Sequence, residues 1–174
     1  MKILNIERIL STTDLNIDLA EIKTTTGNII ERFIIDPLRN AVVGVACYKG
    51  QLILIKTKRF LWDKKTWELP GGWIKDGEIA LSAIRRKVEE ETGYEVSDIK
   101  RLGNTFSDIG MTKKEKFYFF VDVTQKKFHH NEDIVDKVGL FSIQQVKKLI
   151  HKGEIIDDRT IAGVMLAESK GFLK

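Results

Sequence analysis

Residues 71–94 read GGWIKDGEIALSAIRRKVEEETGY, and they are the most informative stretch of this 174-residue chain. Glycines mark the first half, and apolar residues recur at helical spacing from Ile79 to Thr92. Glu78 suits the positive end of a helix dipole, and Gly93 is a typical residue just past a helix end. We therefore predict a glycine-rich loop that leads into a helix over residues 79–92.

Three successive glutamates, Glu89, Glu90 and Glu91, occupy the last turn of this predicted helix. The helix dipole favours cations at that end, so a bound divalent metal would compensate the acidic cluster. A rotation of about 100° per residue places Glu91 near the inward side marked by Val88, Glu90 at its edge and Glu89 opposite. Glu90 and Glu91 thus offer hard oxygen ligands for Mg²⁺ or Mn²⁺. The alternative is a solvated acidic face, which fits Glu89 well and Glu91 poorly.

From Gly72 to Tyr94 the segment resembles the Nudix box, the glycine, spaced-glutamate and Arg-Glu-apolar-x-Glu-Glu-x-Gly signature of the Nudix hydrolase family. The positions that match in register are Gly72, Glu78, Arg86, Val88, Glu90, Glu91, Gly93 and Tyr94. The resemblance implies that Glu90, Glu91 and the Gly71 carbonyl bind the metal. It also implies that Gly72, Glu78 and Arg86 brace the loop against the helix.

Lys87 departs from the signature, because the family has a glutamate directly after the arginine. In many relatives that glutamate binds metal or assists the attacking water. A charged lysine cannot ligate a metal, but Lys87 precedes Glu90 and Glu91 by three and four residues, within ion-pair reach. Two interpretations stay open. In the first, Lys87 is a tethered cation that occupies part of the space of the metal. In the second, its pKa is shifted and it takes part in proton transfer.

The resemblance continues outside the box, towards the ADP-ribose pyrophosphatase branch. The segments that carry it are the box entry Trp67–Gly72, the strand Leu52–Arg59 and the tail Gly153–Ala162. In this branch, extra N-terminal strands often help to form a dimer. We therefore divide the chain into N-terminal strands over residues 1–40, which are expected to form a homodimer, and a Nudix domain over residues 41–174.

Several residues outside the box are candidates for contact with substrate. Arg59 is expected to hold a phosphate and Glu68 to contact substrate, although Arg59 could simply cap a strand end. Trp62 is the preferred side chain for stacking on a nucleobase, ahead of Phe60 and Trp67, because aromatic residues near a strand more often belong to the core.

A further catalytic carboxylate is expected from a loop outside the box, as in the same branch. The candidates are Glu132, Asp133 and Asp136, which lie between Asn131 and a strand near Val138. We favour Glu132. The alternative is that each is a solvated bystander, because the whole loop is acidic.

Strands are expected at the β-rich runs of the remaining chain. These are Ile3–Leu10, Leu19–Thr24, Ile29–Ile35, Ala41–Tyr48, Gln51–Thr57, Phe117–Val123 and Val138–Phe141. Turn residues 26–28 favour a hairpin between the second and third of them. Strands mixed with a few helices, without regular alternation, indicate an α+β fold. The resemblance refines this to a Nudix-type α/β/α sandwich with a mixed sheet and extra N-terminal strands.

Two more helices follow the last predicted strand. The capping-box pattern Ser142–Gln145 opens the first, which Gly153 ends. The second is expected to begin near Asp157 and Asp158, with Ile161, Val164 and Met165 on its inward side.

Bulk composition narrows the class of protein. The net charge is +4 and the pI near 9.1, but acidic and basic residues are interleaved, which makes nucleic acid an unexpected partner and suits an anionic small molecule. No apolar run approaches the roughly 18 residues of a membrane span. The single cysteine, Cys47, is interpreted as a core residue of a cytoplasmic protein. His129, His130 and His151 lack the spacing of metal ligands and are interpreted as surface residues.

Two functions from different classes remain. The first is a Mg²⁺- or Mn²⁺-dependent hydrolase that cleaves the diphosphate of a nucleoside diphosphate linked to another moiety, with an ADP-ribose-like sugar nucleotide as first choice. Lys87 would weaken or alter this catalysis. The second is a catalytically inactive Nudix fold that binds a nucleotide.

Overall fold

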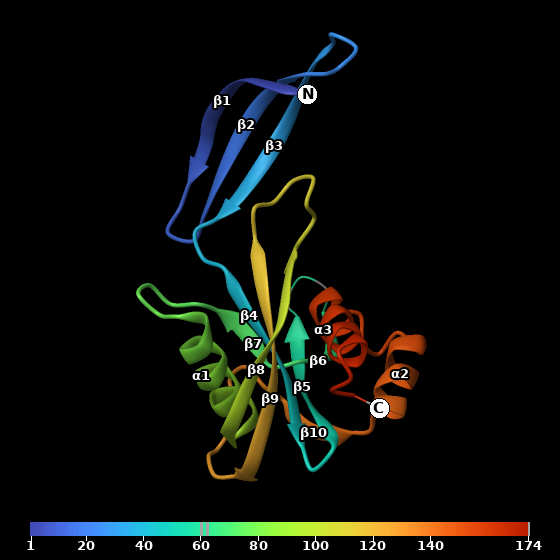
Figure 1. The fold of residues 1–174 in the computed structure, drawn as a ribbon. Helices are drawn as coiled ribbons and strands as arrows, with labels where there is room; N and C mark the ends of the chain where they lie inside the picture. Colours follow the sequence, from blue (N-terminus) through green and yellow to red (C-terminus); the bar gives the residue numbers. More distant parts are fainter. Residues whose placement is uncertain (60, 62, 174) are drawn as a thin grey trace. The chain divides into compact units, whose positions relative to one another are not determined.

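A computed structural model describes residues 1–59, 61 and 63–173 (Figure 1). These residues form two compact units. One contains Met1–Asn40 together with residues 104–116, and the other contains residues 41–103 and the chain from Phe117 onward. The sequence did not link residues 104–116 to the N-terminal strands. Phe60 and Trp62, two of the aromatic candidates, lie outside the described residues.

The first unit is built on an antiparallel three-stranded sheet in the order β1-β2-β3. Its strands are β1 (Lys2–Ser11), β2 (Leu15–Lys23) and β3 (Ile29–Pro37). The predicted hairpin between β2 and β3 is confirmed, and the Thr24 N–H donates to the Asn28 carbonyl at 2.8 Å. Residues 111–113 lie along β3, because Ile35 accepts a backbone hydrogen bond from Lys113 and donates one to Met111.

The second unit is built on a seven-stranded sheet whose main path runs β10-β5-β4-β9-β8. Its strands are β4 (Ala41–Tyr48), β5 (Gln51–Arg59), β6 (Lys64–Glu68), β7 (Gly71–Trp73), β8 (Tyr94–Phe106), β9 (Glu115–Lys126) and β10 (Lys137–Phe141). β6 pairs with β5, and β7 pairs with β4. The sequence reasoning predicted no strand at β6, β7 or β8.

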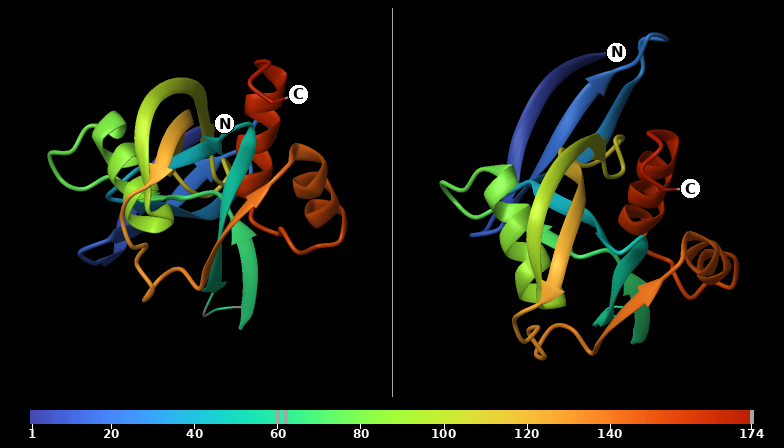
Figure 2. Two further views of the ribbon diagram at one scale, coloured as in Figure 1. Left: turned by 90° about the horizontal axis from the view of Figure 1, so that it is seen from below. Right: turned by 60° about the horizontal axis from the view of Figure 1, so that its bottom comes forward.

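Both faces of this sheet are covered by helices, which confirms the predicted α+β fold and its sandwich. The helices are α1 (Ala80–Thr92), α2 (Ile143–His151) and α3 (Asp158–Ser169). Val43 and Val45 of β4 join a buried cluster with residues of α2 and α3, whereas Val42 and Ala46 join a cluster with residues of α1. Figures 1 and 2 show α1 on one side of the sheet and α2 and α3 on the other. Successive side chains of β4 point to opposite faces of the sheet, so this strand contributes to the buried clusters on both sides.

The helix ends follow the predicted chemistry. Gly93 adopts a left-handed conformation with φ of 77° and its N–H donates to the Glu89 carbonyl, which ends α1. The Ser142 hydroxyl accepts from the Gln145 N–H, and the Gln145 side chain accepts from the Ser142 N–H, so the capping box is confirmed. The prediction of the inward side of α3 was partly wrong, because Met165 is exposed while Val164 is buried.

Ile84 anchors α1 to the sheet, and its loss should destabilise the fold. Its side chain is fully buried in the cluster with Val42 and Ile53. We expect Ile84→Ala to lower the free energy of unfolding by about 2–5 kcal/mol in urea denaturation, because it leaves a cavity. Leu81→Ala, on the exposed side of the same helix, is the matched control and should change it by no more than about 0.5 kcal/mol. Equal losses in the two variants would contradict this packing.

Candidate active site

Glu91 is a buried carboxylate at the C-terminal turn of α1, and only 4% of it is exposed. One of its oxygens accepts a hydrogen bond from the Gly71 N–H at 2.9 Å, and the other accepts from the Lys87 ammonium at 3.2 Å. Burial raises the pKa of Glu91, and the charge of Lys87 and the Gly71 N–H oppose that shift. The prediction that Glu91 points inward is confirmed.

Lys87 lies between the two carboxylates that the resemblance assigns to the metal. Its ammonium is 3.2 Å from Glu91 Oε1 and 3.9 Å from Glu90 Oε2. The side chain packs on Gly72, where a Cβ atom would come within 2.8 Å of Lys87 Cε. A residue larger than glycine at position 72 would therefore push Lys87 out of this place. The arrangement agrees with the interpretation of Lys87 as a tethered cation.

A bidentate ion pair joins the glycine-rich loop to the helix. Arg86 Nε donates to Glu78 Oε1 and Arg86 Nη2 to Glu78 Oε2, both at 2.8 Å. The Lys75 N–H donates to the same carboxylate, and the Trp73 carbonyl accepts from Arg86. The hydrogen bonds from Arg86 and Lys75 lower the pKa of Glu78 to about 2. This is the geometry that bracing of the loop requires.

The other two glutamates of the cluster have different surroundings. Glu90 is exposed and accepts from Arg86 Nη1 at 3.2 Å. Glu89 lies on the opposite side of the helix, as predicted, but it is half-buried rather than fully solvated. Its carboxylate accepts from the Val96 N–H at 3.2 Å and lies 3.8 Å from Arg85.

A pocket of about 560 Å³ lies beside β5 and β6, at the N-terminal end of α3. Basic side chains from Lys58, Arg59 and Lys64 line it, together with the acidic residues Glu68, Asp157 and Asp158. Arg59, half-exposed at the end of β5, presents a guanidinium to this space. The pocket is thus of mixed charge, and the Arg59 guanidinium is the group in it that can meet an anionic ligand.

Glu68 is almost completely buried behind Arg59, with 1% exposure. Its carboxylate accepts hydrogen bonds from Arg59, from Thr57 at 3.1 Å and from Arg159 Nη2 at 2.7 Å. Sequence reasoning proposed no role for Arg159. Its partner Glu68 lies 91 positions earlier, and only the fold brings the two residues together.

The acidic loop before β10 meets the C-terminal end of α1 through its backbone. The Asn131 N–H donates to the Glu90 carbonyl at 2.9 Å, and Glu132 follows it as an exposed residue. Asp136 instead pairs with Lys65 at 2.6 Å, on a different strand edge. Of the three acidic candidates, Glu132 and Asp133 are thus next to the contact with the Glu90 backbone.

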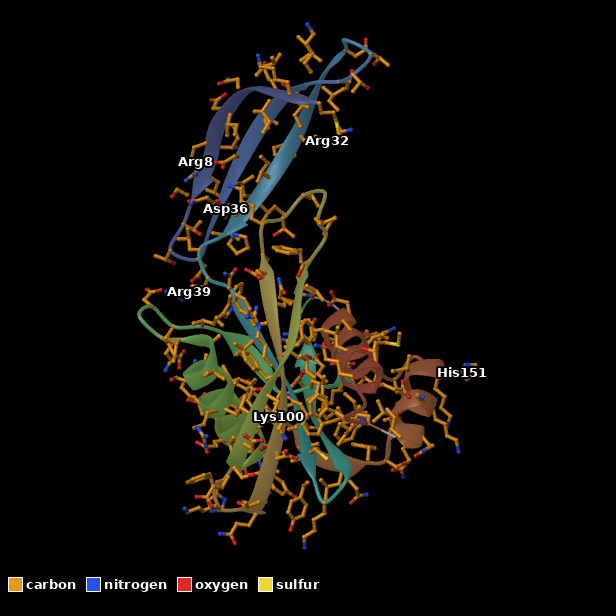
Figure 3. All side chains as sticks on the ribbon, in the orientation of Figure 1. Arg8, Arg32, Asp36, Arg39, Lys100 and His151 are labelled. Carbon is orange, nitrogen blue, oxygen red and sulfur yellow. The ribbon has the colours of Figure 1, made fainter. Side chains whose placement is uncertain are left out.

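Two sets of side chains keep the interpretation that the sequence suggested. Trp67 packs against the core, edge-on to Phe141 at 4.8 Å between ring centroids. His129 and His151 are exposed whereas His130 is half-buried, and Figure 3 shows the His151 side chain projecting away from α2.

The carboxylates of the site have to provide any ligands for a divalent ion. In the part of the chain that the structure describes, no group of three His, Cys, Asp or Glu side chains is close enough to hold a metal. Glu90 and Glu91 nevertheless already share one cation, the Lys87 ammonium. Two carboxylates that converge on one positive charge fit one hard cation, provided that Lys87 moves aside.

The chain matches the NUDIX domain model over residues 37–163. It therefore belongs to the Nudix family, as the box predicted. The ADP-ribose pyrophosphatase of Bacillus subtilis is 22% identical over 171 residues, which are 97% of this chain and 92% of that protein. This match supports the predicted resemblance to the ADP-ribose pyrophosphatase branch.

Two further matches extend the comparison. A Streptomyces rubellomurinus protein named CMP-5'-(N-acetyl-N-hydroxy-3-aminopropyl)phosphonate hydrolase is 26% identical over 108 residues, 62% of this chain and 52% of that protein. The chain thus matches about half the length of that relative. A solved structure described as an ADP compounds hydrolase superposes with a TM-score of 0.84 at 16% identity, and the match covers 98% of this chain and 95% of that one. The shared fold is therefore the Nudix fold.

The Glu78–Arg86 pair should make stability depend on pH in the acidic range. The folded pKa of Glu78, about 2, lies below its unfolded value of about 4.3. The stabilisation is therefore complete above the unfolded pKa and is lost as the pH falls towards the folded pKa. Near neutral pH, the urea concentration at the midpoint of unfolding should be higher for the native protein than for Glu78→Gln. The difference between the two midpoints should shrink towards pH 2. The same substitution in an Arg86→Met background should show a smaller trend, because only the hydrogen bond from the Lys75 N–H then lowers the pKa of Glu78. A pH-dependent difference of undiminished size would contradict the pairing.

Proposed function

We propose that this chain is a divalent-metal-dependent hydrolase of nucleoside diphosphates linked to another moiety, with an ADP-ribose-like sugar nucleotide as the preferred substrate. The products would be a nucleoside monophosphate and a phosphorylated remainder. The observation that carries this proposal is the buried Glu91, which faces the glycine-rich loop beside Glu90. The names of the Bacillus relative and of the similar solved structure support the choice of substrate.

The roles of the residues follow from their positions. Glu90 and Glu91 would hold Mg²⁺ or Mn²⁺, with the Gly71 carbonyl added by the resemblance. Such an ion, when bound, neutralises a diphosphate and activates water. Arg59 would orient a phosphate from the pocket wall, and the Glu78–Arg86 pair would keep the loop fixed relative to α1. Glu132 remains the proposed source of a further carboxylate.

Lys87 favours a second candidate function, a nucleotide-binding module without turnover. In this proposal it stands where the family has a metal-binding or water-assisting glutamate. Its ammonium already neutralises part of the charge of Glu90 and Glu91. A diphosphate could then bind without divalent metal, attracted by Lys87 and Arg59. In the hydrolase, the same lysine would weaken or alter catalysis.

Hydrolysis of ADP-ribose and related nucleoside diphosphates, with Mg²⁺ or Mn²⁺, separates the two candidates. We expect slow metal-dependent turnover by the native protein, which Glu91→Gln abolishes because it removes the buried carboxylate charge. We expect Lys87→Glu to raise turnover roughly 10- to 100-fold, the range seen when groups around a metal site change. Leu81→Ala, on the solvent side of α1, should behave like the native protein.

The other outcomes of this assay have clear meanings. Turnover by Lys87→Glu alone would make the native chain a binding module. Turnover that persists in Glu91→Gln, or that needs no divalent metal, would overturn the hydrolase mechanism.

We propose that the N-terminal strands form a homodimer. The three-stranded sheet exposes large apolar side chains, among them Leu10, Ile29 and Phe33. We expect the native chain to sediment as a dimer in analytical ultracentrifugation and Phe33→Ser to shift it towards the monomer. Leu81→Ser, a similarly exposed residue on α1, is the control. A monomeric native chain would contradict the proposal.

We also propose a cytoplasmic location, because the single Cys47 is a free thiol packed against the core. Among the described residues, no helix is both long and apolar enough to cross a membrane. The expected partner is a nucleotide-type small molecule, as the names of the similar proteins suggest.

A further inference from the structure

We infer that Arg159 is a positioning residue for the ligand pocket, which acts through Glu68 to keep the Arg59 guanidinium available to an anionic group. The inference rests on the proposed function for the nature of the ligand, a nucleoside diphosphate. The residues that carry it come from β5, β6 and the first turn of α3.

Glu68 is the centre of this arrangement. Burial removes the hydration of an ionised carboxylate, and this is unfavourable unless charged and hydrogen-bonding partners replace the water. Three side chains supply those partners. Thr57 and Arg59 reach Glu68 from β5, and Arg159 reaches it from α3.

The two arginines on Glu68 differ in what else they contact. Arg159 has an exposed side-chain fraction of 20%, and its Nε donates to Asp157 at 2.9 Å. Asp157 in turn caps α3 by accepting from the Thr160 N–H at 3.0 Å, and the Thr160 hydroxyl accepts from the Leu69 N–H at 2.9 Å. Arg159 is therefore held by Asp157 at the start of α3 and by Glu68 of β6, and α3 is itself hydrogen-bonded to the segment after β6.

Arg59, in contrast to Arg159, is half-exposed and faces the pocket. Its side chain is 47% exposed, lines the pocket and is anchored through Glu68. The bidentate contact fixes the plane of the guanidinium, which leaves an N–H edge for a ligand oxygen. Arg59 is thus the member of the pair that can meet a phosphate.

Charge balance explains why Arg159 is needed. Glu68 and Asp157 are two acids on a pocket wall that must attract an anion, and Arg159 pairs with both of them. Without Arg159, two carboxylates would compete for Arg59 and neutralise the charge that it presents to the pocket. Arg159 therefore affects ligand binding through the carboxylates rather than by touching the ligand.

The test is a double-mutant cycle on the binding of ADP-ribose, measured by calorimetry. Turnover is prevented in two ways: the first set of measurements contains EDTA, and the second contains Mg²⁺ and is made in the Glu91→Gln background. We expect Arg59→Met and Arg159→Met each to weaken binding about 10- to 100-fold, the loss expected for a charge-assisted hydrogen bond. The double variant should be no weaker than Arg59→Met alone, because Arg159 acts through Arg59. Arg159→Lys should recover part of the affinity, because it restores the charge.

Controls separate positioning from folding. Lys147→Met removes another ion pair of α3, with Glu168, and should leave binding unchanged. Should Arg159→Met not fold, as judged by thermal unfolding, Glu68→Gln interrupts the same path without changing the shape of the side chain. It should weaken binding to the same degree.

Several results would overturn the inference. These are additive losses in the cycle, an unchanged affinity in Arg159→Met, or no binding of ADP-ribose by the native protein under either condition. Failure of the proposed function is distinguishable, because a native chain that binds ADP-ribose through Arg59 and Arg159 but never cleaves it would leave this inference intact.

Discussion

The close packing of α1 on β4 is the constraint on which the site depends. At Gly44 a Cβ atom would lie 2.9 Å from Ile84 Cδ1 and 3.0 Å from Val88 Cγ2, so the helix can approach the sheet this closely only over a glycine. Val88 and Glu91 lie on neighbouring turns of the same helix face. The packing that buries Val88 therefore also buries Glu91 and brings its carboxylate to the Gly71 N–H.

Burial of Glu91 determines the electrostatics of the surroundings. A carboxylate in this position must be hydrogen-bonded or paired, and Lys87 and the Gly71 N–H satisfy it. Glu68, the other buried carboxylate of this region, is satisfied by two arginines instead. Both buried acids of the site are thus satisfied by basic partners, and the half-exposed Arg59 is the one of these partners that can also meet an anionic ligand.

The sequence predicted the helix of the box, its end at Gly93 and the inward direction of Glu91, because these follow from the 3.6-residue period. It did not predict β8, where Val96 and Leu102 are the fully buried side chains, so the apolar signal is sparse. The three-residue β7 forms by pairing with β4 rather than from its own propensity. In α3, apolarity favoured Met165, whereas the structure buries Gly163, where a Cβ atom would lie 2.6 Å from Leu69. Contacts between distant residues, such as Arg159 and Glu68, have no local signature.

The assignment of residues 104–116 to the N-terminal unit has a consequence for how the chain is made. β3 receives backbone hydrogen bonds from a segment that is synthesised more than 70 residues later, with the Lys113 N–H donating to the Ile35 carbonyl. On the ribosome, where chains emerge at about 5–20 residues per second, the first three strands must wait for several seconds before this edge of β3 is covered. An uncovered strand edge pairs readily with other chains. The three N-terminal strands are therefore synthesised well before they acquire their full set of neighbours.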